Sequence, residues 1–198
     1  GRKEYQQNRG QVLDVSGVSQ AQADGPEGAQ FAAAHSGQRR FCVILVQFTD
    51  YGFRKGAEMN NMLNQDGFQG TGSVAEYYRN SSWNKFQPIY EVWGPVTVPM
   101  TKRQARDDTG QMIYYACQQA DALGANFANY DTDNNGEVDN VYCFFAGYDR
   151  AQGGGDDCIW SHASGIGHKN LYLDGKKISG YGCSSELKGN SGANRVNI

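Results

Sequence analysis

The sequence predicts an α/β fold, in which helices pack against a sheet. Two continuous apolar runs, FCVILVQFTD at 41–50 and VYCFFAGY at 141–148, have the length and composition of strands buried on both faces. Between them, residues 110–123 carry apolar side chains at helical spacing. Strands that alternate with helices are typical of the α/β class, and a length of 198 residues suits one globular domain.

The N-terminal segment, residues 1–38, is rich in Gln, Gly, Ala and charged residues and poor in large apolar side chains. Such a composition buries too little apolar surface to offset the entropy of ordering the chain. We therefore expect a flexible arm that ends a pro-segment, followed by a domain over 39–198. Arg39 and Arg40 stand at the junction with the first strand, where a trypsin-like protease would reach an exposed linker.

The segment after the first strand predicts two short helices and an extended stretch. One helix is expected around Met59 to Leu63. A second begins at Ser73, because Glu76 three residues later completes the pattern of a capping box. Residues 86–99 (FQPIYEVWGPVTVP) are expected to be extended, with prolines at edges or breaks.

A longer helix is predicted over 110–123, with Asp107, Asp108 and Thr109 as candidate caps and Gly124 as the stop. Its apolar face consists of Met112, Ile113, Ala116, Cys117, Ala120 and Leu123. Farther along the chain, Asp174-Gly175 predicts a β-hairpin within NLYLDGKKIS.

Residues 131–139 have the spacing D-x-D-x-N-G-x-x-D, which predicts a calcium-type loop that leads into the second strand. Carboxylates this close repel one another unless a cation or hydrogen-bond donors neutralise them. Position 12 of an EF-hand needs a bidentate Glu, and this chain has Tyr142, so ligands from elsewhere would complete the site. The alternative is a solvated polar turn. The predicted ligands are Asp131, Asp133, Asn135, the Glu137 carbonyl and Asp139.

Composition excludes some function classes. A net charge of −3 gives no nucleic-acid footprint, and no apolar run is long enough for a membrane span. The 26 glycines and 12 tyrosines favour a loop-rich secreted or cell-surface domain, which we expect to be a monomer. Among five cysteines, Cys158 and Cys183 lie in loop-like segments and could pair, the alternative being buried free thiols.

Candidate catalytic residues are few. His162, in CIWSHAS, is either a cleft histidine that bonds a substrate or metal, or a structural one that donates to a backbone carbonyl. Glu186, in CSSEL, is expected to be a surface carboxylate, with a ligand or an edge-strand residue as alternatives. The chain contains no G-x-S-x-G nucleophile elbow.

Five segments in this order and spacing resemble the immune inhibitor A type of secreted zinc metallopeptidases, peptidase family M-six. They are VILVQFTD, GSVAEYYRNSSWNKFQPIYEVWGPVTVP, YDTDNNGEVDNVYCFFAGY, IWSHAS and CSSEL, and they span about residues 40 to 187. The resemblance implies a zincin-like fold, a twisted mixed sheet over helices. In that family an active-site helix bearing H-E-x-x-H completes the fold after the SSEL region.

No H-E-x-x-H occurs in the 198 residues, so the chain lacks the two histidines and the glutamate that place zinc, water and general base together. The resemblance therefore implies the N-terminal part of a catalytic domain that cleaves protein or peptide substrates. Zinc is expected only in the complete parent domain, and an edge strand near 178–186 could hold an extended peptide. The alternative is a calcium-stabilised, non-catalytic binding or adhesion module.

Overall fold

The computed structural model describes residues 36–190 and Val196, which lie in one compact unit, His35–Ile198. Of the predicted arm, residues 1–35 lie outside the described residues, and Gly37 and Gln38 already belong to the first strand. No helix in the described ranges has the length and apolar character that a membrane crossing requires.

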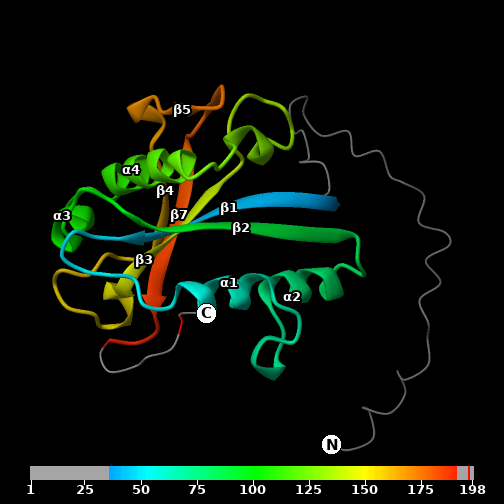
Figure 1. Ribbon diagram of the computed structural model, residues 1–198, viewed down its shortest axis with the longest axis horizontal. Coiled ribbons are helices and arrows are strands. Elements are labelled where there is room, and N and C mark those ends of the chain that lie inside the picture. Colours follow the sequence, from blue (N-terminus) through cyan, green and yellow to red (C-terminus); the bar gives the residue numbers. More distant parts are fainter. Residues whose placement is uncertain (1–35, 191–195, 197–198) are drawn as a thin grey trace, which may run out of the picture. The chain divides into compact units, whose positions relative to one another are not determined.

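A mixed five-stranded sheet lies at the centre of this unit, with the order β2-β1-β3-β7-β4 (Figure 1). Its members are β1 (Gly37–Gln47), β2 (Phe86–Thr97), β3 (Val141–Tyr148), β4 (His162–Gly165) and β7 (Gly180–Leu187). Neighbouring strands are parallel except at one edge, where β4 runs antiparallel to β7. The α/β class is therefore confirmed.

Helices cover both faces of the sheet. They are α1 (Gly56–Asn64), α2 (Val74–Ser81), α3 (Lys102–Asp107) and α4 (Thr109–Ala122), with 3-10 turns η1 (Phe68–Gly70), η2 (Phe127–Tyr130), η3 (Arg150–Gln152) and η4 (Gly167–Lys169). Figure 1 shows α4 on one side of the sheet and α1 with α2 on the other. The expected helix near Met59 is thus confirmed as α1, whereas α3 was not predicted.

The first predicted strand is confirmed as β1, and it is buried on both faces. Residues Cys42–Val46 are at most 2 % exposed. Because side chains alternate along a strand, Ile44 packs in one cluster with Met112 of α4, and Leu45 packs in the other with Met59 of α1. Burial on both faces explains why this run carries no polar alternation.

The ends of α4 follow the capping chemistry in the sequence. Asp108 is the N-cap, and its side chain accepts a hydrogen bond from the Gln111 N–H at 2.8 Å. Gly124 has φ of 102°, the left-handed conformation that ends helices. The prediction for Leu123 is wrong: it lies at the C-cap and is 58 % exposed, because the helix has ended before its side chain can reach the core.

The capping box predicted at α2 forms only in half. Ser73 Oγ accepts a hydrogen bond from the Glu76 N–H at 3.2 Å, as expected for the N-cap. Glu76 Oε2 does not return to the cap but accepts from the Gly67 N–H at 2.7 Å. The carboxylate therefore ties the preceding loop to the helix.

Two further expectations are corrected by the sheet. Arg39 and Arg40 are not a linker, because they pair with Pro88 and Ile89 of β2 inside the sheet, which protects that backbone from a protease. The segment near 178–186 is not an edge strand, because β7 lies between β3 and β4. The hairpin at Asp174-Gly175 is confirmed as β5 (Tyr172–Leu173) and β6 (Lys176–Lys177).

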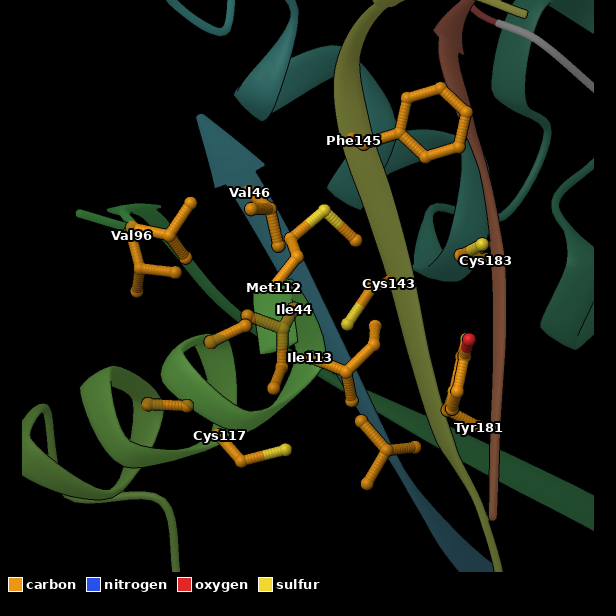
Figure 2. Close-up of a cluster of buried hydrophobic side chains, with 14 of the residues drawn as sticks. Ile44, Val46, Val96, Met112, Ile113, Cys117, Cys143, Phe145, Tyr181 and Cys183 are labelled. Atoms are coloured by element: carbon orange, nitrogen blue, oxygen red, sulfur yellow. The ribbon is translucent and has the colours of Figure 1, made fainter. Parts of the chain in front are cut away.

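All five cysteines are free and buried, so the reading as buried thiols is confirmed and the possible pairing of Cys158 with Cys183 does not form. Cys183 faces the core from β7, directly opposite Cys143 of β3, whereas Cys158 contacts Lys102. Figure 2 shows Cys117, Cys143 and Cys183 among the apolar side chains between α4 and the sheet.

Candidate metal site

The predicted calcium-type loop connects η2 to β3, and backbone hydrogen bonds fix both of its sides. The Asp139 N–H donates to the Tyr130 carbonyl at 2.9 Å. The Val138 N–H donates to the Lys177 carbonyl, and the Lys177 N–H to the Gly136 carbonyl, each at 2.9 Å. The loop is therefore held by the chain that precedes it and by strand β6 of the hairpin.

Three of the predicted ligands come together. One carboxylate oxygen each from Asp131, Asp133 and Asp139 lies within 4.8 Å of the others, a spacing at which a single metal ion could contact all three. The side chain of Asp131 is fully buried, whereas Asp133 and Asp139 are exposed. This is the one such group of His, Cys, Asp or Glu in the part of the chain that the structure describes.

Turn hydrogen bonds hold Asp131 and Asn135. Asp131 Oδ1 accepts from the Asn135 N–H and its Oδ2 from the Gly136 N–H, both at 3.0 Å. Gly136 has φ of 91°, a conformation that allows the sharp turn at this position. These donors compensate part of the negative charge that the loop concentrates.

The other two predicted ligands are placed differently. The side-chain oxygen of Asn135 accepts from the Glu137 N–H at 2.8 Å, so it is engaged within the turn. The Glu137 carboxylate lies 3.9 Å from Lys177 Nζ. The hydrogen bonds to β6 use the neighbouring Gly136 carbonyl and Val138 N–H, so they do not consume the Glu137 carbonyl that was predicted as the ligand.

Lys176 approaches the same cluster from the hairpin. Its Nζ lies 2.7 Å from Asp131 Oδ2 and forms a salt bridge with it. This hydrogen bond is the main cause that holds the pKa of Asp131 below its ordinary value, with the N–H groups of Gly136 and Asn135 acting in the same direction and burial opposing them.

A partly buried network anchors the beginning of the loop to the sheet. Tyr130 Oη donates to Glu91 Oε2 at 2.6 Å and accepts from Trp93 Nε1 at 2.9 Å. Arg40 forms a salt bridge with Glu91 from β1. Burial, followed by the hydrogen bond to Glu91, raises the pKa of Tyr130, so this phenol stays a neutral donor.

His162 lies in β4 with both ring nitrogens engaged. Nδ1 lies 2.7 Å from the Trp160 carbonyl oxygen, and because a carbonyl only accepts, Nδ1 carries the hydrogen. In the neutral ring Nε2 then accepts from Tyr181 Oη at 2.9 Å. This arrangement fits the structural reading of His162, since neither nitrogen is left to bind zinc or a substrate.

The sequence did not predict the environment of Glu186. Its side chain is fully buried, so the expectation of a surface carboxylate is wrong. Oε1 accepts from the N–H groups of Arg54 and Lys55, each at 2.5 Å, and Oε2 accepts from the Gly147 N–H at 3.2 Å. The carboxylate thus joins β7, β3 and the loop before α1, segments that are far apart in sequence.

An apolar cavity of about 650 Å³ opens on the face of the sheet that α1 and α2 partly cover. Its walls include Val43 and Phe144 of the sheet and Leu63 of α1, and its polar end includes Asp149 and Ser161. Cavities of this size with few polar groups are typical of binding sites or of surfaces that another segment covers.

Neither a protein-family model nor a curated protein sequence matches this chain.

Proposed function

We propose that this chain is the N-terminal part of the catalytic domain of a secreted zinc metalloendopeptidase, to which it supplies the sheet, a cleft wall and a calcium-type loop. The main support for the proposal is that the segments resembling the family are the ones that form the sheet. The five segments that resemble the peptidase family contain the whole or the core of β1, β2, β3, β4 and β7, which are all five strands of the central sheet. Segments that resemble a family in order and also build one sheet support a shared fold more strongly than separate motifs do.

The edge of this sheet suits an extended peptide. β4 is the antiparallel edge strand, and Ala163, Ser164 and Gly165 are exposed. A peptide that adds to such an edge gains main-chain hydrogen bonds and leaves alternate side chains for recognition. The proposal therefore places substrate along β4, and not along 178–186.

The described residues do not fit a catalytic zinc ion. Of the three histidines in the chain, His162 has both nitrogens engaged, and His168 lies in η4 outside any group of ligands. A catalytic zinc site needs three protein ligands and an open position. The proposal therefore assigns the zinc ligands to another part of the parent protein, and the apolar cavity beside α1 is a surface against which an additional helix could pack.

The acidic loop fits a hard cation. Calcium is bound by carboxylate and carbonyl oxygens. Asp131, Asp133 and Asp139 offer clustered carboxylates, and the Glu137 carbonyl would be a further ligand. Its charge would balance the carboxylates and hold the entry to β3 in place. Lys176 balances only one of them, through Asp131 Oδ2.

The test compares this chain with the complete protein. If the coding sequence continues into H-E-x-x-H shortly after the Glu186 region, the complete protein should cleave casein, lose activity with a zinc chelator and recover it with added zinc. Replacing the first histidine of that motif by alanine should abolish cleavage, whereas His162→Ala should leave activity within about twofold, because its role here is structural.

The 198-residue chain alone should release no peptide above background, with or without zinc. Zinc-dependent cleavage by the pure chain that His162→Ala abolishes would contradict the proposal. A complete protein that binds calcium and neither contains H-E-x-x-H nor cleaves casein would contradict it as well, and would favour the binding or adhesion module.

A further inference from the structure

A cationic hollow lies at the carboxyl end of the sheet, away from the acidic loop. It has a volume of about 590 Å³ and is lined by Arg103, Arg106, Arg150, Asp156 and Asp157. The first two arginines come from α3, which follows β2, and the other residues come from the loop that follows β3. Figure 1 shows α3 and this loop at the same end of the sheet.

The place of the hollow relative to the strands matters, because parallel sheets bind ligands at particular places. The chain passes from β1 to β2 on one side and continues from β3 to β7 on the other, so the strand order reverses between β1 and β3. In open α/β sheets, ligands bind outside the carboxyl ends of the strands at such a switch point. The residues that line the hollow follow β2 and β3, the two strands that flank β1, and none of them comes from the segment that follows β1.

The two acidic residues of the hollow already have cationic partners. Asp157 Oδ2 lies 3.4 Å from Nζ of Lys102, whose side chain is only 5 % exposed, and Asp156 Oδ1 lies 3.2 Å from Arg150 Nη2. Arg106 pairs with Asp107 beside it. Within the described part of the chain, no hydrogen bond or ion pair engages the exposed guanidinium of Arg103, which leaves one positive charge unmatched.

The guanidinium groups also converge. Arg106 Nη1 and Arg150 Nη1 both donate to the Asp156 carbonyl, the second at 3.4 Å, so two like charges are held near one oxygen atom. Each guanidinium presents five N–H donors in a planar fork that matches carboxylate and phosphate oxygens. The contacts given above use only part of these donors.

We propose that this hollow binds an oxyanion group, phosphate or sulfate in free form or as part of a larger ligand, with Arg103, Arg106 and Arg150 as donors. The Asp156 side chain is 97 % exposed, and an ion pair this exposed contributes little to stability. The ligand can therefore displace the Asp156 carboxylate from Arg150. The site is separate from the acidic loop and from the substrate edge, and the proposal does not depend on the peptidase function.

The test is calorimetric titration of the full chain with inorganic phosphate and with sulfate at constant ionic strength. We expect saturable binding, and Arg103→Ala should weaken it about tenfold, the loss of one charge-assisted contact. Asp156→Asn should tighten binding, because it removes the competing carboxylate. A phosphate monoester that binds more tightly than free phosphate would identify the group as part of a larger ligand, and equal affinity would identify the free ion.

Arg79→Ala is the matched control, because it removes the same charge from α2, where Arg79 pairs with Asp66. It should bind phosphate as the unchanged chain does. Arg103 makes no contact that folding requires, so its variant should melt at the same temperature as the unchanged chain without phosphate. The proposal is overturned if binding is not saturable, or if Arg79→Ala and Arg103→Ala weaken it equally.

Discussion

The buried carboxylate of Glu186 accepts three backbone hydrogen bonds, and we expect Glu186→Gln to lower the free energy of unfolding by about 2–3 kcal/mol. A glutamine has one acceptor oxygen and one donor group, so its NH₂ must face at least one backbone N–H. Urea unfolding measures the change. The matched control is Glu58→Gln, which breaks a partly exposed salt bridge with Lys55 and should cost less than about 1 kcal/mol. Equal losses of unfolding free energy in both variants would show that the three backbone hydrogen bonds to Glu186 stabilise the fold no more than one partly exposed salt bridge does.

The buried thiols predict a loss of stability at alkaline pH. Burial is the main cause that raises the pKa of Cys183 to about 11, and it also raises the pKa values of Cys42, Cys117 and Cys143. An unfolded thiol ionises near pH 8.5, so this stability is complete below about pH 8.5 and is lost as the pH rises toward about 11.

The measurement for the thiols is urea unfolding at several pH values above 8. Cys183→Ala should show a shallower decline of the free energy of unfolding with pH, whatever its stability at neutral pH. Identical slopes for the variant and the unchanged chain would exclude Cys183 as a source of the decline.

At the scale of elements, two neighbouring aspartates at the start of α4 have different roles, since only Asp108 caps the helix. Asp108→Ala should cost about 1 kcal/mol, because the Gln111 N–H loses its acceptor at the N-terminus of the helix. Asp107→Ala removes only a pair with Arg106 and should cost less than about 0.5 kcal/mol. Thermal or urea unfolding of both variants tests the assignment, and the reverse order of the two costs would contradict it.

The loop before β3 predicts calcium-dependent stability. A ligand that binds only the folded state stabilises it by about 2.7 kcal/mol at a hundredfold excess over its dissociation constant. The thermal midpoint should therefore be higher with excess calcium than with chelator. Asp133→Asn should reduce that difference, because it removes the charge of one proposed ligand. Asp133 bonds only to Asn135 within the turn, so the substitution should disturb little else. Asp66→Asn removes an exposed carboxylate that pairs with Arg79 and is not part of the acidic cluster, so it should leave the difference unchanged. Equal midpoints with calcium and chelator would identify a polar turn.

Elements whose signals are local were predictable from the sequence. The apolar runs of β1 and β3, the periodicity of α4 and the Asp174-Gly175 turn each depend on a few consecutive residues. Helix α3 was missed because its six residues KRQARD carry too little apolar periodicity, although Thr101 and Gln104 form a capping box. In the loop, the clustering of Asp131, Asp133 and Asp139 followed from their spacing.

At the scale of the whole molecule, the unpredicted features depend on strand order. Glu186 was expected at the surface because nothing local shows that β7 lies between β3 and β4, where its carboxylate meets backbone from two other segments. The same order places the edge at His162–Gly165. Lys176 reaches the acidic loop because β6, through Lys177, pairs with the loop backbone at Gly136 and Val138. Such contacts join residues far apart in sequence, and no local pattern contains them.

The most direct test is native mass spectrometry of this chain and of the complete protein, with calcium and zinc present. It tests the proposal that this chain binds the calcium and that another part of the parent protein binds the zinc. We expect the 198-residue chain to bind one calcium ion and no zinc, and Asp133→Asn to lose the calcium. The complete protein should bind one calcium ion and one zinc ion. Stoichiometric zinc on the 198-residue chain, or no specific calcium on either protein, would contradict a calcium-stabilised sheet that receives its zinc ligands from another part of the parent.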